Sequence, residues 1–148
     1  MQVFGCVTAG VTACAIPSLT IIFNTMYITW VVWDIEGSEE FGEWFAGLTR
    51  SEKISVAGKI DLLEEKGPAL GRQHADTLRG SKLPNLKELI IQHAGDAFRV
   101  IFAFDPRRTA ILLVGGRKSG NKWYKTSIPG AERIYERYIE EIRKEGLI

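Results

Sequence analysis

The sequence is poor in the residues that build disulfide frameworks and metal sites. Its 148 residues include two cysteines, Cys6 and Cys14, and two histidines. The cysteines form no CxxC motif, and the sequence contains no HExxH pair of metal ligands. We therefore expect no disulfide framework, no metal ion and no other cofactor. Two isolated cysteines near one end of the chain fit a protein of the reducing cytoplasm.

Charge is missing from the beginning of the chain, where no charged residue precedes Asp34. A secretory signal would open with basic residues, and a membrane span needs about 20 mostly apolar residues, a run that polar residues, glycine and proline interrupt here. We interpret residues 1–25 as an extension that is disordered or lies upstream of the true start at Met26, with a membrane anchor as the alternative. Residues 26–148 then form one domain of ordinary size.

The hydrophobic pattern of that domain predicts an α+β fold. β-branched and aromatic runs predict a buried strand at 28–33 and three antiparallel strands at 86–92, 98–104 and 110–114. Helical spacing of apolar residues predicts helices over 39–48, 52–66 and 131–144, the first capped by Ser38 and the second by Thr49 or Ser51. The order predicts an N-terminal strand and a helical hairpin packed on a mainly antiparallel sheet with a C-terminal helix.

The remaining segments, 69–85 and 115–129, are predicted to be loops, and Glu132 of the last helix is expected to face water. The charges are distributed unevenly over these elements. Nine acidic and four basic residues lie in 34–66, whereas seven basic and two acidic residues lie in 96–125. The net charge of +1 therefore hides a basic second half, which suits a polyanionic partner such as a nucleic acid.

One cation, Arg99, lies inside a predicted strand. Alternation along the strand puts Arg99 and Ile101 on one face and Phe98 and Val100 on the other, which we assign to the core. A guanidinium held on a sheet can bind a phosphate. The structural alternative is an ion pair with Glu88 on the neighbouring strand. Glu88 can in turn accept a proton or only shape the site.

The segment 115–125 carries the strongest local signal for a nucleic acid. It places four cations within nine residues and adds two aromatic side chains, namely Arg117, Lys118, Lys122, Lys125, Trp123 and Tyr124. Cations bind phosphates, aromatic faces stack on bases, and Gly115–Gly116 lets the backbone come close to a ligand. The alternative is a solvated loop that Trp123 and Tyr124 anchor to the core.

The first predicted loop, 69–85, contributes His74, Arg79 and Lys82. Histidine is the side chain best suited to proton transfer near neutral pH, and the two cations can bind phosphate. The alternative for His74 is a hydrogen bond to the backbone or to Asp76.

These motifs together resemble the RelE/ParE toxin superfamily, and most closely its HigB-like, phage-derived (Gp49-like) branch. The resemblance covers about residues 30–145 and leaves the N-terminal extension outside. It is carried by Leu78-Arg79-Gly80-Ser81, Leu86-Lys87-Glu88-Leu89, Phe98-Arg99-Val100-Ile101-Phe102-Ala103-Phe104-Asp105-Pro106, Ile111-Leu112-Leu113-Val114-Gly115-Gly116-Arg117-Lys118, Trp123-Tyr124 and the final helix.

The resemblance implies a toxin of a type II toxin–antitoxin system that cleaves mRNA, often on the ribosome, without a metal ion. The ribose 2′-OH would attack the adjacent phosphate and leave a cyclic phosphate and a 5′-OH. Carried onto this chain, the catalytic positions are Arg99, Lys118, Tyr124 and Arg117, with His74, Glu88 and Tyr124 as candidates for proton transfer. Further RNA or phosphate contacts would come from Lys87, Arg79, Lys82, Lys122, Trp123 and Lys125. The resemblance also implies a cognate helix-turn-helix antitoxin.

Three other functions remain open on the sequence. A ParE-like toxin of the same fold would inhibit gyrase by protein contact. A non-catalytic RNA-binding domain would use the same basic face, and a degenerate phage remnant would have no activity. Assays of RNA cleavage and of gyrase inhibition distinguish these functions.

Overall fold

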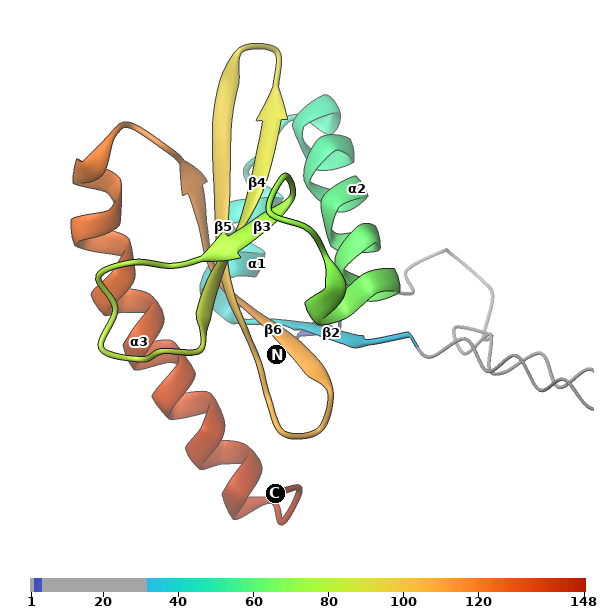
Figure 1. Cartoon of the computed structure of the whole chain (residues 1–148), viewed down its shortest axis with the longest axis vertical. Coiled ribbons are helices and arrows are strands. Elements are labelled where there is room, and N and C mark those ends of the chain that lie inside the picture. Colours follow the sequence, from blue (N-terminus) through green and yellow to red (C-terminus); the bar gives the residue numbers. More distant parts are fainter. Residues whose placement is uncertain (1, 4–31) are drawn as a thin grey trace, which may run out of the picture.

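The computed structural model describes residues 2–3 and 32–148, which form one six-stranded mixed sheet with helices on both faces (Figure 1). The strands follow the order β1-β2-β6-β5-β4-β3, in which only β2 and β6 pair in parallel. The strands are β1 (Gln2–Val3), β2 (Asp34–Gly37), β3 (Ala75–Thr77), β4 (Leu86–His93), β5 (Asp96–Phe104) and β6 (Thr109–Arg117). The helices are α1 (Glu39–Ala46), α2 (Arg50–Lys66), the 3-10 turn η1 (Gly67–Ala69) and α3 (Asn121–Lys144). The predicted α+β fold is confirmed.

The predicted boundaries are wrong in three places. Val32 and Trp33, the described end of the predicted strand 28–33, lie outside any strand, and β2 begins at Asp34; residues 28–31 lie outside the described part of the chain. The segment 69–85 contains the short strand β3, and the predicted loop 115–129 belongs to β6 and α3. Pro129 lies inside α3, although its missing N–H leaves the carbonyl of Lys125 without a helical hydrogen bond.

Most of the predicted N-terminal extension also lies outside the described residues. Its Gln2–Val3 segment forms β1, which pairs antiparallel with Glu36–Gly37 at the edge of the sheet. The boundary at residue 25 stays a prediction. No helix within residues 32–148 has the length and apolar character needed to cross a membrane.

The sheet separates two hydrophobic clusters because alternate side chains of its central strands point to opposite faces. Phe98, Val100 and Phe102 of β5 pack with α1 and α2, and Ile101 and Ala103 pack with α3. The predicted alternation of β5 is therefore confirmed. However, the face that carries Arg99 is also covered, because α3 lies on it.

Two adjacent glycines of β6 allow tryptophans to pack directly on the sheet. A Cβ atom at Gly115 would lie 2.1 Å from Trp44 of α1, and one at Gly116 would lie 2.2 Å from Trp123 of α3. Such distances leave no room for any side chain. We predicted that these glycines admit a ligand, but the described structure fills the space with indole rings.

The caps of the helical hairpin follow the sequence. Ser38 caps α1, as predicted, by accepting a hydrogen bond from the Phe41 N–H. Thr49, rather than Ser51, caps α2 through a capping box with Glu52. The Thr49 N–H donates to the Glu52 carboxylate at 3.0 Å, and the Glu52 N–H donates to the Thr49 hydroxyl at 3.3 Å.

Replacing Thr49 by alanine is expected to lower the free energy of unfolding by about 1 kcal/mol, because an N-terminal N–H of α2 loses its acceptor. Urea denaturation measures the change. Ser51→Ala is the matched control and should shift stability by less than about 0.5 kcal/mol, since within residues 32–148 the Ser51 hydroxyl makes only 3.4 Å contacts, with Thr49 and His93. Equal losses in the two variants would contradict the assignment of the cap.

A buried polar network joins the β5–β6 turn to α3. The Asp105 carboxylate accepts hydrogen bonds from the Tyr138 hydroxyl at 2.7 Å and from the Arg107 guanidinium at 3.0 Å. Arg107 also donates to the Tyr138 oxygen at 2.6 Å and lies 3.5 Å from Glu36 of β2. Burial, followed by the hydrogen bond to Asp105, raises the pKa of Tyr138. The network ties three elements together at the end of the sheet remote from the start of α3.

Candidate active site

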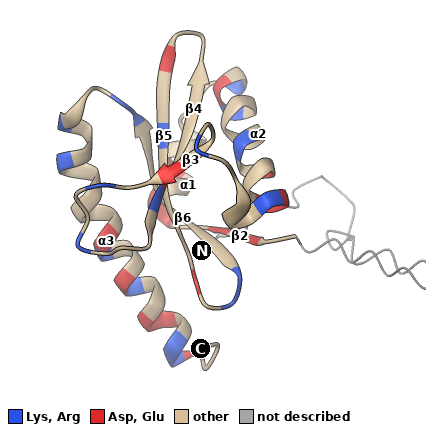
Figure 2. Cartoon of the chain, in the orientation of Figure 1, with Lys and Arg blue, Asp and Glu red and all other residues tan. Residues whose placement is uncertain are grey.

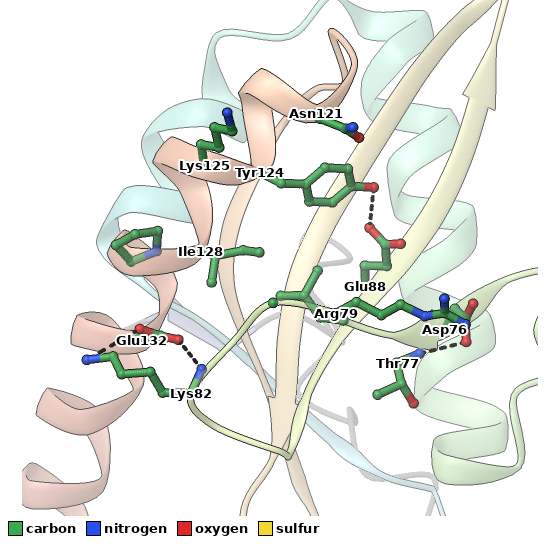
Figure 3. Close-up of a pocket in the computed structure, with 13 residues that line it drawn as sticks. Asp76, Thr77, Arg79, Lys82, Glu88, Asn121, Tyr124, Lys125, Ile128 and Glu132 are labelled. Carbon is green, nitrogen blue, oxygen red and sulfur yellow. Dashed lines mark hydrogen bonds and ion pairs between the residues drawn. The ribbon is translucent and has the colours of Figure 1, made fainter.

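A pocket of about 740 Å³ opens between α3, β4 and the loop that joins β3 to β4 (Figure 3). Its walls combine three cations and three carboxylates with one tyrosine and several apolar groups. The lining residues are Asp76, Thr77, Leu78, Arg79, Gly80, Lys82, Glu88, Asn121, Tyr124, Lys125, Ile128, Pro129 and Glu132. Five of the twelve predicted site residues are among them: Arg79, Lys82, Glu88, Tyr124 and Lys125.

Four predicted site residues, Arg99, Glu88, Tyr124 and Lys118, form a cluster at the inner end of the pocket, and of these Glu88 and Tyr124 line it. The Tyr124 hydroxyl of α3 donates a hydrogen bond to the Glu88 carboxylate of β4 at 2.7 Å. The same carboxylate oxygen lies 3.9 Å from the Nε atom of Arg99 on β5. The Lys118 ammonium lies 5.4 Å from the centre of the Tyr124 ring. The cluster therefore brings together side chains from β4, from β5, from the residue that follows β6 and from α3.

Arg99 lies behind this wall rather than in it. Arg99 is 8% exposed and does not line the pocket, whereas Glu88 and Tyr124 do. Its Nη1 atom donates to its neighbour's carbonyl, Phe98 O, at 2.9 Å, and its buried Nε atom has no hydrogen-bond partner among the described residues. The predicted Arg99–Glu88 ion pair is confirmed. A buried N–H without an acceptor is costly, and the charge of the Glu88 carboxylate, 3.9 Å from this Nε atom, offsets part of that cost.

The environment of Tyr124 keeps its hydroxyl protonated. Burial, followed by the hydrogen bond to the negatively charged Glu88, raises the pKa of Tyr124 from 10.0 to about 12, while Arg99 acts in the opposite direction. Tyr124 is therefore a hydrogen-bond and proton donor at neutral pH rather than a base. The pocket holds two of the three candidates for proton transfer, Tyr124 and Glu88, which leaves Glu88 as the proton acceptor.

The titration of Tyr124 should follow from this geometry. Since its pKa in the folded protein lies above the ordinary value, the stability that Tyr124 contributes is complete below pH 10 and is lost as the pH rises toward about 12. The ultraviolet absorbance of the phenolate, taken as the difference between the protein and its Tyr124→Phe variant, measures this pKa. Glu88→Gln should move it back toward 10.0. A Tyr124 pKa near its ordinary value in the unmodified chain would contradict the hydrogen bond to Glu88.

Basic residues gather around the pocket. They lie on the loop between β3 and β4, at the end of β6 and in the first turns of α3 (Figure 2). Arg79, Lys82 and Lys125 form its rim, and the three are exposed. Lys122 is exposed in the first turn of α3 but does not line the pocket. Exposed cations around the recessed carboxylate of Glu88 can bind a polyanion, and the carboxylate can accept a proton from a hydroxyl group of that ligand.

Glu132 is a pocket residue that the sequence analysis missed, because we expected it to face water. It is 4% exposed and accepts hydrogen bonds from the Ser81 hydroxyl and the Lys82 N–H. These contacts, that of Ser81 first, lower the pKa of Glu132. A helix that starts at Asn121 places Tyr124, Ile128 and Glu132 on one side at four-residue spacing. The position of Glu132 on the pocket side of α3 therefore follows from the sequence once the start of the helix is known.

Three predicted site residues lie away from the cluster. Arg117 projects to the face of α1 and α2, where it pairs with Glu52 and Asp96 and covers the Phe98 ring. Lys87 alternates with Glu88 along β4 and so shares the face of Leu89, which packs with α1 and α2.

The third of these residues is His74, whose Nδ1 atom lies 2.5 Å from the Lys59 ammonium of α2. His74 does not line the pocket. Trp123 is next to the cluster, with its ring 5.0 Å from that of Tyr124, but its indole packs on Gly116. The alternative that the Trp–Tyr pair anchors this segment is therefore supported for Trp123, while Tyr124 both anchors and lines the pocket.

A mixed sheet with a helical hairpin on one face and a C-terminal helix on the other defines this chain as an α+β protein of the RelE-like kind. Residues 43–136 match the family described as "Phage derived protein Gp49-like (DUF891)". This range includes every predicted site residue. The chain therefore belongs to the phage-derived Gp49-like family, as the resemblance predicted.

Two curated proteins of Mycobacterium tuberculosis are similar to this chain. The protein described as "Putative toxin HigB3" is 48% identical over 98 residues, which are 65% of this chain and 84% of that protein. The protein described as "Putative toxin HigB2" is 40% identical over 106 residues, which are 70% of this chain and 53% of that protein. The chain thus spans about half the length of the second relative. The resemblance to HigB-like toxins is confirmed.

Proposed function

We propose that this protein is the toxin of a type II toxin–antitoxin system and that it cleaves mRNA in the pocket beside α3 without a metal ion. The observation that carries the proposal is the meeting of Glu88, Tyr124, Lys118 and the buried Arg99 at the wall of a pocket with a cationic rim. The similarity to two HigB toxins supports the biological role. The substrate would be translated mRNA on the ribosome, and the site of action the cytoplasm.

The proposed reaction is an internal transfer of the RNA phosphate. Glu88 takes the proton of a ribose 2′-OH, whose oxygen forms a bond to the adjacent phosphorus while the bond from phosphorus to O5′ breaks. Tyr124, released from Glu88 as that carboxylate is protonated, gives its proton to O5′. The products are a cyclic phosphate and a 5′-OH, and proton exchange with water restores both side chains.

The cations would have two separate tasks. Lys118 and Lys125, near Tyr124, stabilise the charge that builds on the phosphate in the transition state. Arg79 and Lys82 bind the flanking backbone. Arg99 is buried behind Glu88, and we assign it a positioning role: it fixes the orientation of the carboxylate.

The proposal includes a partner. A cognate helix-turn-helix antitoxin would neutralise the toxin by binding it directly and covering the cationic rim. Coexpression and copurification with the product of the neighbouring gene test that part of the proposal.

The decisive assay incubates the purified full-length chain with a single-stranded RNA, with ribosomes present and absent, and analyses the ends of the fragments. We expect cyclic phosphate and 5′-OH ends, activity that persists in a chelator, and no cut where a 2′-deoxynucleotide precedes the scissile bond. RNA binding without cleavage would identify a binding domain instead. Inhibition of DNA supercoiling by gyrase, with RNA left intact, would identify a ParE-like toxin.

A further inference from the structure

We propose that Glu132 is a positioning residue whose buried carboxylate holds the loop between β3 and β4 on α3 and so fixes Arg79 and Lys82 at the rim of the pocket. The inference rests on the proposed function of that pocket. It concerns a residue outside the proposed reaction, on the opposite side of the pocket from Glu88 (Figure 3).

One carboxylate holds consecutive residues of the loop. Its Oε1 atom accepts hydrogen bonds from the Ser81 hydroxyl at 2.8 Å and from the Lys82 N–H at 2.7 Å. Its Oε2 atom lies 3.7 Å from the Lys82 ammonium. The Ser81 oxygen accepts in turn from the Leu83 N–H at 3.0 Å. The path of the backbone from Ser81 to Leu83 is therefore set by Glu132.

The position of Glu132 on α3 argues against a role in packing alone. Its buried neighbours on the helix, Ile128, Ala131 and Ile134, are apolar and belong to the cluster between α3 and the sheet. A charged group that is 4% exposed loses its hydration, and donors must compensate for that loss. In the described part of the chain, these donors come entirely from the loop. An apolar side chain at this position would fill the space but leave the loop unattached.

The positioning role and simple electrostatics predict opposite changes in RNA affinity when Glu132 is removed. Removing a carboxylate beside an RNA pocket should strengthen RNA binding, because one repulsion of phosphate disappears. If Glu132 positions the cationic loop, its removal should instead weaken RNA binding. If Glu132 had only a structural role in the fold, a variant of unchanged stability would not show this weaker RNA binding.

The test measures binding of a 2′-O-methyl RNA oligonucleotide, which lacks the attacking hydroxyl and cannot be cleaved. Glu132→Ala is expected to raise the Kd about tenfold, a modest effect for a displaced binding group. Glu132→Gln keeps an oxygen acceptor for Ser81 and the Lys82 N–H and should stay within about threefold of the original chain. Glu136→Ala is the matched control: Glu136 is exposed on the same helix, and its loss should leave the Kd unchanged or lower it.

Hydrogen exchange at the Lys82 amide supplies a second readout that needs no RNA. It should accelerate in Glu132→Ala and stay unchanged in Glu136→Ala. Should Glu132→Ala not fold, Ser81→Ala replaces it, since this change removes one of the donors and keeps the carboxylate. Binding by Glu132→Ala as tight as that of Glu136→Ala, or unchanged exchange at Lys82, would overturn the inference. If the unmodified chain bound no RNA, the proposed function would be overturned instead. The role of the loop in RNA binding would then fall as well.

Discussion

Cells that express the Arg99→Ala variant without antitoxin are expected to grow, whereas cells that express the unmodified chain should stop. The purified variant should cleave RNA at least about a hundredfold more slowly, within the range typical of general-base catalysis. Arg99 is the only cation that contacts Glu88 in the described structure, and its loss leaves the carboxylate held by Tyr124 alone. Lys118→Ala should relieve growth arrest as well, because it removes the cation over the Tyr124 ring.

Arg117→Ala is the matched control for this experiment. It removes the same charge from the neighbouring strand of the sheet, at a residue adjacent to Lys118, but on the face of α1 and α2. It should therefore remain toxic. Toxicity that survives both Arg99→Ala and Lys118→Ala at equal protein level would refute the assigned site, as would inactivity of Arg117→Ala to the same degree.

The position of Arg117 also explains where sequence reasoning reached its limit. Alternation along β6 carries Ile111 and Leu113 to the side of α3. If this alternation continued without interruption to the end of β6, the side chain of Arg117 would point to the α3 side of the sheet, where the pocket lies. Opposite Ile101 and Phe102, however, β6 has one extra residue, so Leu113 and Val114 both pack toward α3. This β-bulge reverses the faces beyond it, and an apolar pattern carries no sign of such a shift.

The parts of the site that the sequence did predict depend on local chemistry. Short turns between three apolar runs require neighbouring antiparallel strands, and that register brings Glu88 near Arg99. The start of α3 was missed because two local signals opposed a helix. Pro129 and Gly130 are adjacent residues inside α3, and both residue types disfavour the interior of a helix. Packing of Trp123 on Gly116 stabilises the first turn of the helix. Helix propensities of the residues do not include such a tertiary contact.

The turn Asp105-Pro106-Arg107-Arg108 joins β5 to β6, and its structural role suggests the largest effect on stability. The Asp105 side chain is 0% exposed. It accepts hydrogen bonds from the N–H groups of Arg107 and Thr109 at 2.8 and 3.0 Å, besides those from the Arg107 guanidinium and the Tyr138 hydroxyl. Four donors therefore share one carboxylate.

Asp105→Ala is expected to lower the free energy of unfolding by about 3 kcal/mol, because the buried hydroxyl of Tyr138 and two backbone N–H groups lose their acceptor together. Urea denaturation at neutral pH measures the loss. Asp96→Ala is the matched control: its carboxylate side chain is 44% exposed and faces the exposed Arg117, so its removal should cost less than about 1 kcal/mol. Tyr138→Phe should fall between the two, since it removes one donor and leaves three. A loss for Asp105→Ala no larger than that for Asp96→Ala would mean that the turn does not hold α3 to the sheet.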